Sequence, residues 1–216
     1  MPGAISEFTD HSLYESKSWN VQEPFLDCTL MAEIAARHSL SDHIRTYDEA
    51  LSPEHCQSLI DRFEASPNPE ICSQEGSFSF AQIDVTENWP DEYRTLTPIF
   101  LSYFGKYQHA LDARFWPSKF AFEHLRMKRY QPNGTDGFPP HVDVMCQTAA
   151  RRFMTAIIYL NEIVGGETVF PTLGMRIVPK VGTLLAFPPL WLFPHAGLQT
   201  EDRPKYILHT YMCYPS

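Results

Sequence analysis

Hydrophobic positions in the first half of the chain recur at helical spacing. Cys56, Leu59, Ile60 and Phe63 stand at i, i+3, i+4 and i+7, which places them on one face of a helix. The dipeptide at 52–53 precedes them, with serine suited to the N-cap and proline to the first helical position. The pattern therefore predicts an amphipathic helix that begins directly after residue 52.

A second helical pattern follows, and Pro98 within it predicts a kink. Its apolar positions are Tyr93, Leu96, Ile99, Phe100 and Tyr103. A shorter helix is predicted over Thr29–His38 and a strand over Ile44–Tyr47. The rest of residues 1–43 shows no clear pattern, so we treat that segment as an unassigned N-terminal extension.

The pattern changes at about residue 119, where short runs of aromatic and β-branched residues alternate with turn-forming Gly, Pro and Asn. The predicted strands are Phe120–Tyr130, Phe153–Leu160, Thr168–Phe170, Met175–Val178, Thr183–Phe187 and Lys205–Tyr214. Helices followed by short strands favour a mainly β fold with flanking N-terminal helices, a sandwich or jelly roll. We expect one domain over 44–216, with helical support from 44–118 and a jelly-roll core over 119–216.

Charge and composition limit the possible partners and the cellular compartment. The formal net charge of −9 disfavours non-specific binding to nucleic acid, which needs clustered Lys and Arg. The N-terminus resembles no secretory signal, and no apolar run reaches the ~20 residues of a membrane helix. We therefore expect no nucleic-acid or membrane partner. The odd number of cysteines, without close spacing, suggests reduced thiols in a cytoplasmic protein. They are Cys28, Cys56, Cys72, Cys146 and Cys213.

Candidate chemistry appears in the segment FPPHVDVM. His141 and Asp143 are two residues apart, so in an extended strand their side chains point to the same face. His195 in LFPHAGL is the best candidate for a third ligand. Two histidines and one carboxylate on one face of an ion are the arrangement of non-haem Fe(II) oxygenases. The triplet His-x-Asp alone is weak evidence, and a polar strand edge would look the same.

The order of motifs in the C-terminal half resembles the catalytic core of Fe(II)/2-oxoglutarate dioxygenases of the prolyl hydroxylase type. The matching pieces are RYQPNGTDGFPPHVD, RRFMTAIIYLNE, GGETVFP, VPKVGTLLAFP and PHAGLQTEDRPKYILHTYM. The resemblance covers about the last 90 residues. It implies a cupin-like double-stranded β-helix that binds Fe(II), 2-oxoglutarate and O2, with ascorbate as an optional further cofactor.

The same resemblance implies roles in binding 2-oxoglutarate. Family members carry a basic residue ten positions after the distal histidine, and Lys205 stands there. It is expected to bind the far carboxylate of the cosubstrate. Tyr130 and Tyr159 fall where relatives place hydroxyl groups on the cosubstrate. Plain core packing would explain Tyr159 equally simply, and Tyr130 less readily. The turn at Gly165–Gly166 is expected to connect strands without a chemical role.

Strand alternation adds candidates for the substrate pocket. Lys128 and Arg126 share a strand face with Tyr130, and His209 and Tyr211 share a face with Lys205. An inward Lys128 needs an anion, which would favour a carboxylate-bearing substrate over an internal peptide proline. A bulge before residue 130 would instead turn Lys128 to solvent. His209 is equally explained as a core histidine.

The expected activity is hydroxylation of an unactivated C–H bond of a small metabolite, an amino acid or a peptidyl proline, with release of succinate and CO2. One alternative is a catalytically silent, cupin-like protein that binds metal or ligand. Another is a metal-dependent hydrolase with the same three ligands. Nucleic-acid demethylation is disfavoured by the acidic charge. The sequence does not define the substrate or the oligomeric state.

Overall fold

The computed structural model describes residues 39–74, 78–113 and 116–215. The predicted helix over Thr29–His38 and Cys28 lie outside these residues. The helices are α2 (Pro53–Glu64), α3 (Val85–Asn88) and α4 (Pro90–Ala110), and short 3-10 turns cover Leu40–His43, Gln147–Ala149 and Pro171–Leu173. In the described part of the chain, no helix is both long enough and apolar enough to cross a bilayer.

The start of α2 is confirmed: the Ser52 hydroxyl accepts a hydrogen bond from the backbone N–H of His55 at 3.2 Å, and Pro53 occupies the first turn. This N-cap satisfies a backbone donor that has no partner within the helix. The second predicted helix corresponds to α4, and Pro98 lies inside this helix.

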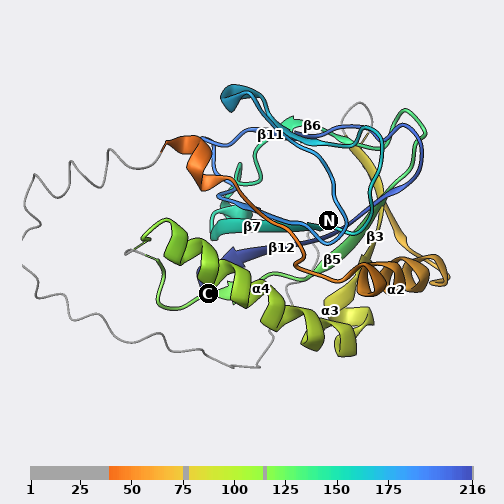
Figure 1. Cartoon of the computed structure of the whole chain (residues 1–216), viewed down its shortest axis with the longest axis horizontal. Helices are drawn as coiled ribbons and strands as arrows, with labels where there is room; N and C mark the ends of the chain where they lie inside the picture. Colours follow the sequence, from red (N-terminus) through yellow and green to blue (C-terminus); the bar gives the residue numbers. More distant parts are fainter. Residues whose placement is uncertain (1–38, 75–77, 114–115, 216) are drawn as a thin grey trace, which may run out of the picture.

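Two antiparallel sheets form the remainder of the fold (Figure 1). The larger runs in the order β1-β10-β7-β12-β5-β3-β2, and β4 pairs with β12. Its strands are β1 (Arg45–Tyr47), β2 (Glu70–Gln74), β3 (Phe78–Asp84), β4 (Ala121–Phe122), β5 (Arg126–Tyr130), β7 (Arg152–Tyr159), β10 (Leu184–Phe187) and β12 (Lys205–Cys213). The smaller runs β6-β11-β8-β9, with strands β6 (Phe138–His141), β8 (Thr168–Phe170), β9 (Met175–Ile177) and β11 (His195–Gly197).

The mainly β fold with flanking helices is confirmed, with local differences. The run predicted over Phe120–Tyr130 is divided into β4 and β5, because residues 123–125 leave the ladder. The short strands β6 and β11 were not predicted, and neither were β2 and β3. Residues 44–118 therefore supply three strands as well as helices.

The larger sheet is buried on both faces. One face packs against the helices, in a cluster that includes Leu59, Phe100 and Leu208. The other faces the smaller sheet, in a cluster that includes Tyr159 and Phe187. Figure 1 shows α2 and α4 on one side of β5 and β12, and β6 and β11 on the other. Alternate residues of one strand therefore pack into two different hydrophobic clusters. We call the space between the two sheets the interior. The candidate site residues face it.

Candidate metal centre

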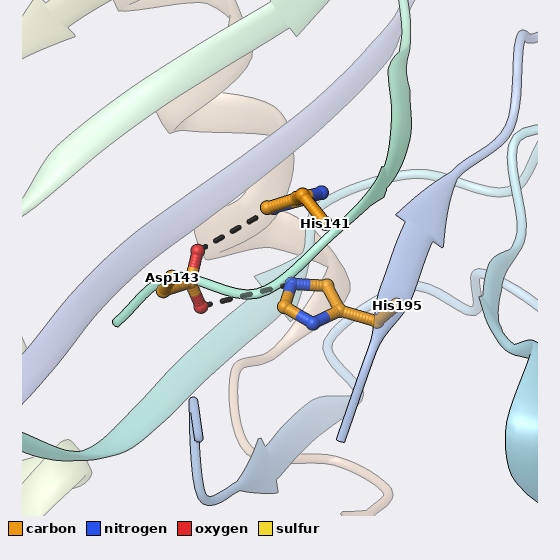
Figure 2. Close-up of side chains that lie close together, drawn as sticks. All are labelled: His141, Asp143 and His195. Atoms are coloured by element: carbon orange, nitrogen blue, oxygen red, sulfur yellow. Dashed lines mark ion pairs between the residues drawn. The ribbon is translucent and has the colours of Figure 1, made fainter. Parts of the chain in front are cut away.

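Three candidate ligands converge at one end of the smaller sheet. His141 ends β6, His195 begins β11, and the two residues pair directly on the ladder. His141 Nε2 lies 3.4 Å from Asp143 Oδ1, and His195 Nε2 lies 3.6 Å from Asp143 Oδ2. Figure 2 shows the carboxylate facing both imidazole rings. One possible ligand atom from each residue lies within 4.8 Å of the others, close enough to share one ion.

Backbone carbonyls orient both imidazole rings. His141 Nδ1 donates to the carbonyl of Pro139 at 2.8 Å, and His195 Nδ1 donates to that of Phe193 at 3.1 Å. Because a carbonyl can only accept, each Nδ1 carries the proton and each Nε2 is left as a lone-pair donor. A hydrogen bond on the second nitrogen is the usual support of a metal-bound histidine.

Asp143 has the features of a cation ligand. Its Oδ2 is buried and has no hydrogen-bond partner among the described residues. Burial alone would raise the pKa of Asp143, but the neighbouring imidazole groups of His141 and His195 hold this pKa well below its usual value. Burial also lowers the pKa of His195, which keeps that ring neutral. A carboxylate and two imidazoles on one side of a shared point fit Fe(II) with open positions.

Lys205 lies on β12 with its ammonium inside the protein. Its residue is 3% exposed, and its Nζ donates to the carbonyl of Gly166 at 3.0 Å. Burial lowers the pKa of Lys205 to about 8, although the negative charge of Glu167 opposes the shift. The turn at Gly165–Gly166 thus does more than connect strands, because its second carbonyl is the hydrogen-bond acceptor of this ammonium.

The two candidate tyrosines, Tyr130 and Tyr159, both lie in the interior cluster. Lys205 and Tyr130 are directly paired between β12 and β5, and Lys205 Nζ lies 4.6 Å from the centroid of the Tyr130 ring. Tyr159 belongs to the same buried cluster as Tyr130, and its hydroxyl donates to Thr168 Oγ1 at 2.7 Å. Tyr130 is therefore placed beside Lys205, whereas the hydroxyl of Tyr159 already has a partner.

The other candidates also face the interior. Lys128 Nζ lies 4.7 Å from the ring centroid of Phe80, within the interior cluster. The His209 ring is hydrogen-bonded to Thr155 Oγ1 at 3.0 Å and lies 4.6 Å from the ring of Tyr211. Continuous pairing of β5 with β12 over 126–130 shows no bulge that would turn Lys128 outward.

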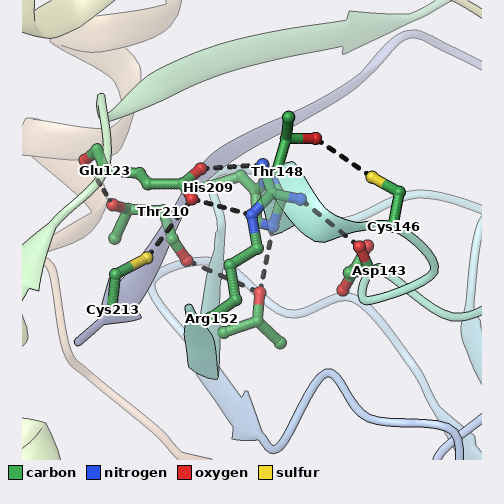
Figure 3. A network of polar contacts seen from close by, with 9 residues as sticks. Glu123, Asp143, Cys146, Thr148, Arg152, His209, Thr210 and Cys213 are labelled. Atoms are coloured by element: carbon green, nitrogen blue, oxygen red, sulfur yellow. Dashed lines mark hydrogen bonds and ion pairs between the residues drawn. The ribbon is translucent and has the colours of Figure 1, made fainter. Parts of the chain in front are cut away.

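Arg152 is a further site residue that the sequence did not indicate. It forms two hydrogen bonds of 2.8 Å to the carboxylate of Glu123, and its guanidinium lies 3.9 Å from the ring centroid of Tyr211. Its third nitrogen lies 3.5 Å from the backbone carbonyl of Asp143. Figure 3 shows Arg152 between Glu123 and Asp143. This network connects the loop that carries Asp143 to the edge of the larger sheet.

The buried ammonium leads to a prediction about stability. Lys205→Met should raise the free energy of unfolding of the ligand-free protein at pH 7 by about 1–3 kcal/mol, because the folded state no longer contains a desolvated cation. Below pH 8 this lysine is charged in both states and the full cost is present; between about pH 8 and 10.5 the cost disappears as the folded lysine loses its proton first. Urea unfolding of both proteins at pH 7 and pH 10 tests this: a variant less stable than the parent at pH 7 would contradict it.

Sequence comparison finds a family similar to the C-terminal part of the chain. Residues 125–213 match the profile of the 2OG-Fe(II) oxygenase superfamily. A putative prolyl 4-hydroxylase of Acanthamoeba polyphaga mimivirus is 35% identical over 104 residues, which cover 39% of this chain and 42% of the relative. The chain therefore spans less than half the length of this curated relative.

Solved structures show the same fold. The viral collagen prolyl hydroxylase vCPH from Paramecium Bursaria Chlorella virus-1, in its 2OG complex, is 24% identical with a TM-score of 0.63, over 79% of this chain and 95% of that one. A Pseudomonas putida prolyl-4-hydroxylase is 18% identical with a TM-score of 0.57, over 87% and 99% of the two chains. The double-stranded β-helix expected from the sequence is confirmed by these likenesses.

Proposed function

We propose that the chain is a prolyl hydroxylase-like, 2-oxoglutarate-dependent hydroxylase of the 2OG-Fe(II) oxygenase superfamily, whose profile residues 125–213 match. It would insert one oxygen atom of O2 into a C–H bond of its substrate and release succinate and CO2. The observation that carries the proposal is the buried Lys205 ammonium, which faces the same interior as the metal triad. A metal-dependent hydrolase with these ligands would have no use for a desolvated cation there.

Each group of residues has a defined task in this reaction. His141, Asp143 and His195 would hold Fe(II), which supplies the activation of O2 when it is bound. Lys205 binds the far carboxylate of 2-oxoglutarate through a charge-assisted hydrogen bond, and Tyr130 lies beside it. Tyr159 would act through packing.

Aromatic side chains pack around His195. The ring centroid of Phe187 lies 4.7 Å from that of His195, and the centroid of Phe170 lies 5.9 Å away. Both phenylalanines are fully buried. Buried apolar side chains beside a metal ligand strengthen electrostatic interactions within the site and limit side reactions with solvent.

The affinity for 2-oxoglutarate should depend on pH. Because the pKa of Lys205 is about 8 in the free protein, the ammonium that binds the carboxylate is present below pH 8 and is lost above it. The dissociation constant should therefore be nearly constant from pH 6.5 to 7.5 and rise by up to about tenfold per pH unit above pH 8. Anaerobic calorimetry with Mn(II)-loaded protein measures this constant. In Lys205→Arg the rise should disappear, since arginine keeps its proton; an equally flat profile in the parent would contradict the assignment.

We propose that the catalytic domain spans 44–216 and that 1–43 is an extension. The substrate is a small metabolite, an amino acid or a peptidyl proline. The protein works in the cytoplasm. Support for the cytoplasm comes from the cysteines in the described residues, all of which are free thiols. The test is a screen of Fe(II)-dependent succinate formation with free amino acids and proline-containing peptides, followed by mass spectrometry for the gain of one oxygen atom. A silent binding protein would form no succinate with any compound.

A further inference from the structure

Strand β5 carries cations on both of its faces, and their surroundings differ. On the face toward the helices, Arg129 forms an ion pair with Glu64 at 2.8 Å. On the interior face are Lys128 and Arg126, both half-buried. Within the described residues, neither of these two side chains makes an ion pair or a hydrogen bond. The Lys128 ammonium makes a cation–π contact with the Phe80 ring.

The carboxylates nearest along the sheet already have partners. Gln82, which pairs with Lys128 across β3 and β5, donates to Glu70 at 2.6 Å. Asp84, the residue opposite Arg126, is hydrogen-bonded to His124 at 2.7 Å. The interior cations therefore lack the acidic partners that the ladder could have provided.

The remaining negative charge is that of the metal ligand. Burial lowers the pKa of Lys128 to about 8, and attraction to Asp143 is the main influence that opposes this shift. Burial, followed by repulsion from Lys128, lowers the pKa of His209 well below its usual value. Lys128, Asp143 and His209 thus lie within electrostatic reach of one another.

Charge counting shows what is missing once the site is loaded. A divalent metal ion takes up the charge of Asp143 and, together with Lys205, balances the two negative charges of 2-oxoglutarate. Lys128 and Arg126, both half-buried, are then left without an anion. Unpaired cations that have lost part of their contact with water are costly, so their presence here indicates an anion that arrives with another ligand.

Resting on the proposed oxygenase function, we propose that Lys128, with Arg126 beside it, forms a carboxylate-binding subsite for the substrate. The substrate class is then a small carboxylic acid, such as a free amino acid, rather than an internal proline of a peptide. Lys128 precedes Tyr130 by two positions on the strand, a separation of about 7 Å, so this subsite and the Lys205 site can hold two different carboxylates.

The test is calorimetry under nitrogen with protein loaded with Mn(II) and 2-oxoglutarate. The probes are L-proline, L-leucine and L-glutamate, each compared with its α-amide. The variants are Lys128→Met, which removes the charge, and Lys128→Arg, which retains it. Lys106→Met is a matched control, because Lys106 is an exposed lysine on α4 whose Nζ lies 4.0 Å from the ring centroid of Tyr103.

At least one acid should bind the parent at least about tenfold more tightly than its amide, and Lys128→Met should remove this preference. Lys128→Arg should retain part of it and Lys106→Met all of it. The inference is overturned if no acid is preferred over its amide, if Lys128→Met weakens acid and amide equally, or if it weakens 2-oxoglutarate instead. Failure of 2-oxoglutarate to bind the Mn(II)-loaded parent would count against the proposed function itself, which separates the two failures.

Discussion

Asp143→Ala is expected to abolish iron-dependent turnover and to weaken Fe(II) binding by more than about 100-fold, beyond the 10–100-fold typical of losing an outer-shell partner. The carboxylate is the sole anionic member of the triad, and its buried Oδ2 has no protein partner among the described residues. Anaerobic equilibrium dialysis measures the iron affinity, and circular dichroism reports whether the fold is retained.

The triad can be tested ligand by ligand. His141→Ala and His195→Ala should lose iron and turnover as Asp143→Ala does, while Asp61→Ala, on the exposed face of α2, should keep both. Full iron occupancy and activity in His195→Ala would remove His195 from the ligand set. His209 would then be the next candidate, although its ring is already hydrogen-bonded to Thr155.

Lys205→Ala should weaken 2-oxoglutarate binding by about 10–150-fold, because the far carboxylate loses a charged hydrogen-bond partner worth about 1.5–3 kcal/mol. The KM for 2-oxoglutarate should rise by this factor, with a smaller effect on kcat at saturation. Lys205→Arg should recover part of the loss, since arginine supplies the charge with a different geometry.

Lys180→Ala is the control, because Lys180 is exposed on the loop before β10. Its KM for 2-oxoglutarate should equal that of the parent. An unchanged KM in Lys205→Ala would show that the cosubstrate carboxylate binds elsewhere, even if the triad holds iron.

The strands that the sequence predicted are those with strong periodic or continuous apolar character. β7 and β12 contain long runs of apolar residues because both of their faces are buried. β2 was missed because it is an edge strand whose hydrophobic member, Ile71, is 66% exposed. In β3 the interior face mixes Phe80 with the polar Gln82, which obscures the alternation. β6 contains two prolines, which in a sequence argue against a strand.

Local spacing predicted the site residues that are close in sequence or share a strand, and it could not predict those held by tertiary contacts. His141 and Asp143 are close in sequence, and the interior direction of Lys128 follows from strand alternation. The ion pair of Arg152 with Glu123 joins residues 29 positions apart on different strands or loops. Its existence depends on the pairing of β4 and β7 with β12, which no local pattern encodes.

The most direct test of the central claim is the conversion of 2-oxoglutarate to succinate by the purified protein with Fe(II). The account predicts succinate formation that requires both Fe(II) and O2, that is lost in Asp143→Ala, and that in Lys205→Ala requires a much higher concentration of 2-oxoglutarate. Absence of succinate from an iron-loaded parent in the presence of O2, across the substrate screen, would contradict the account, as would succinate formation that persists without O2.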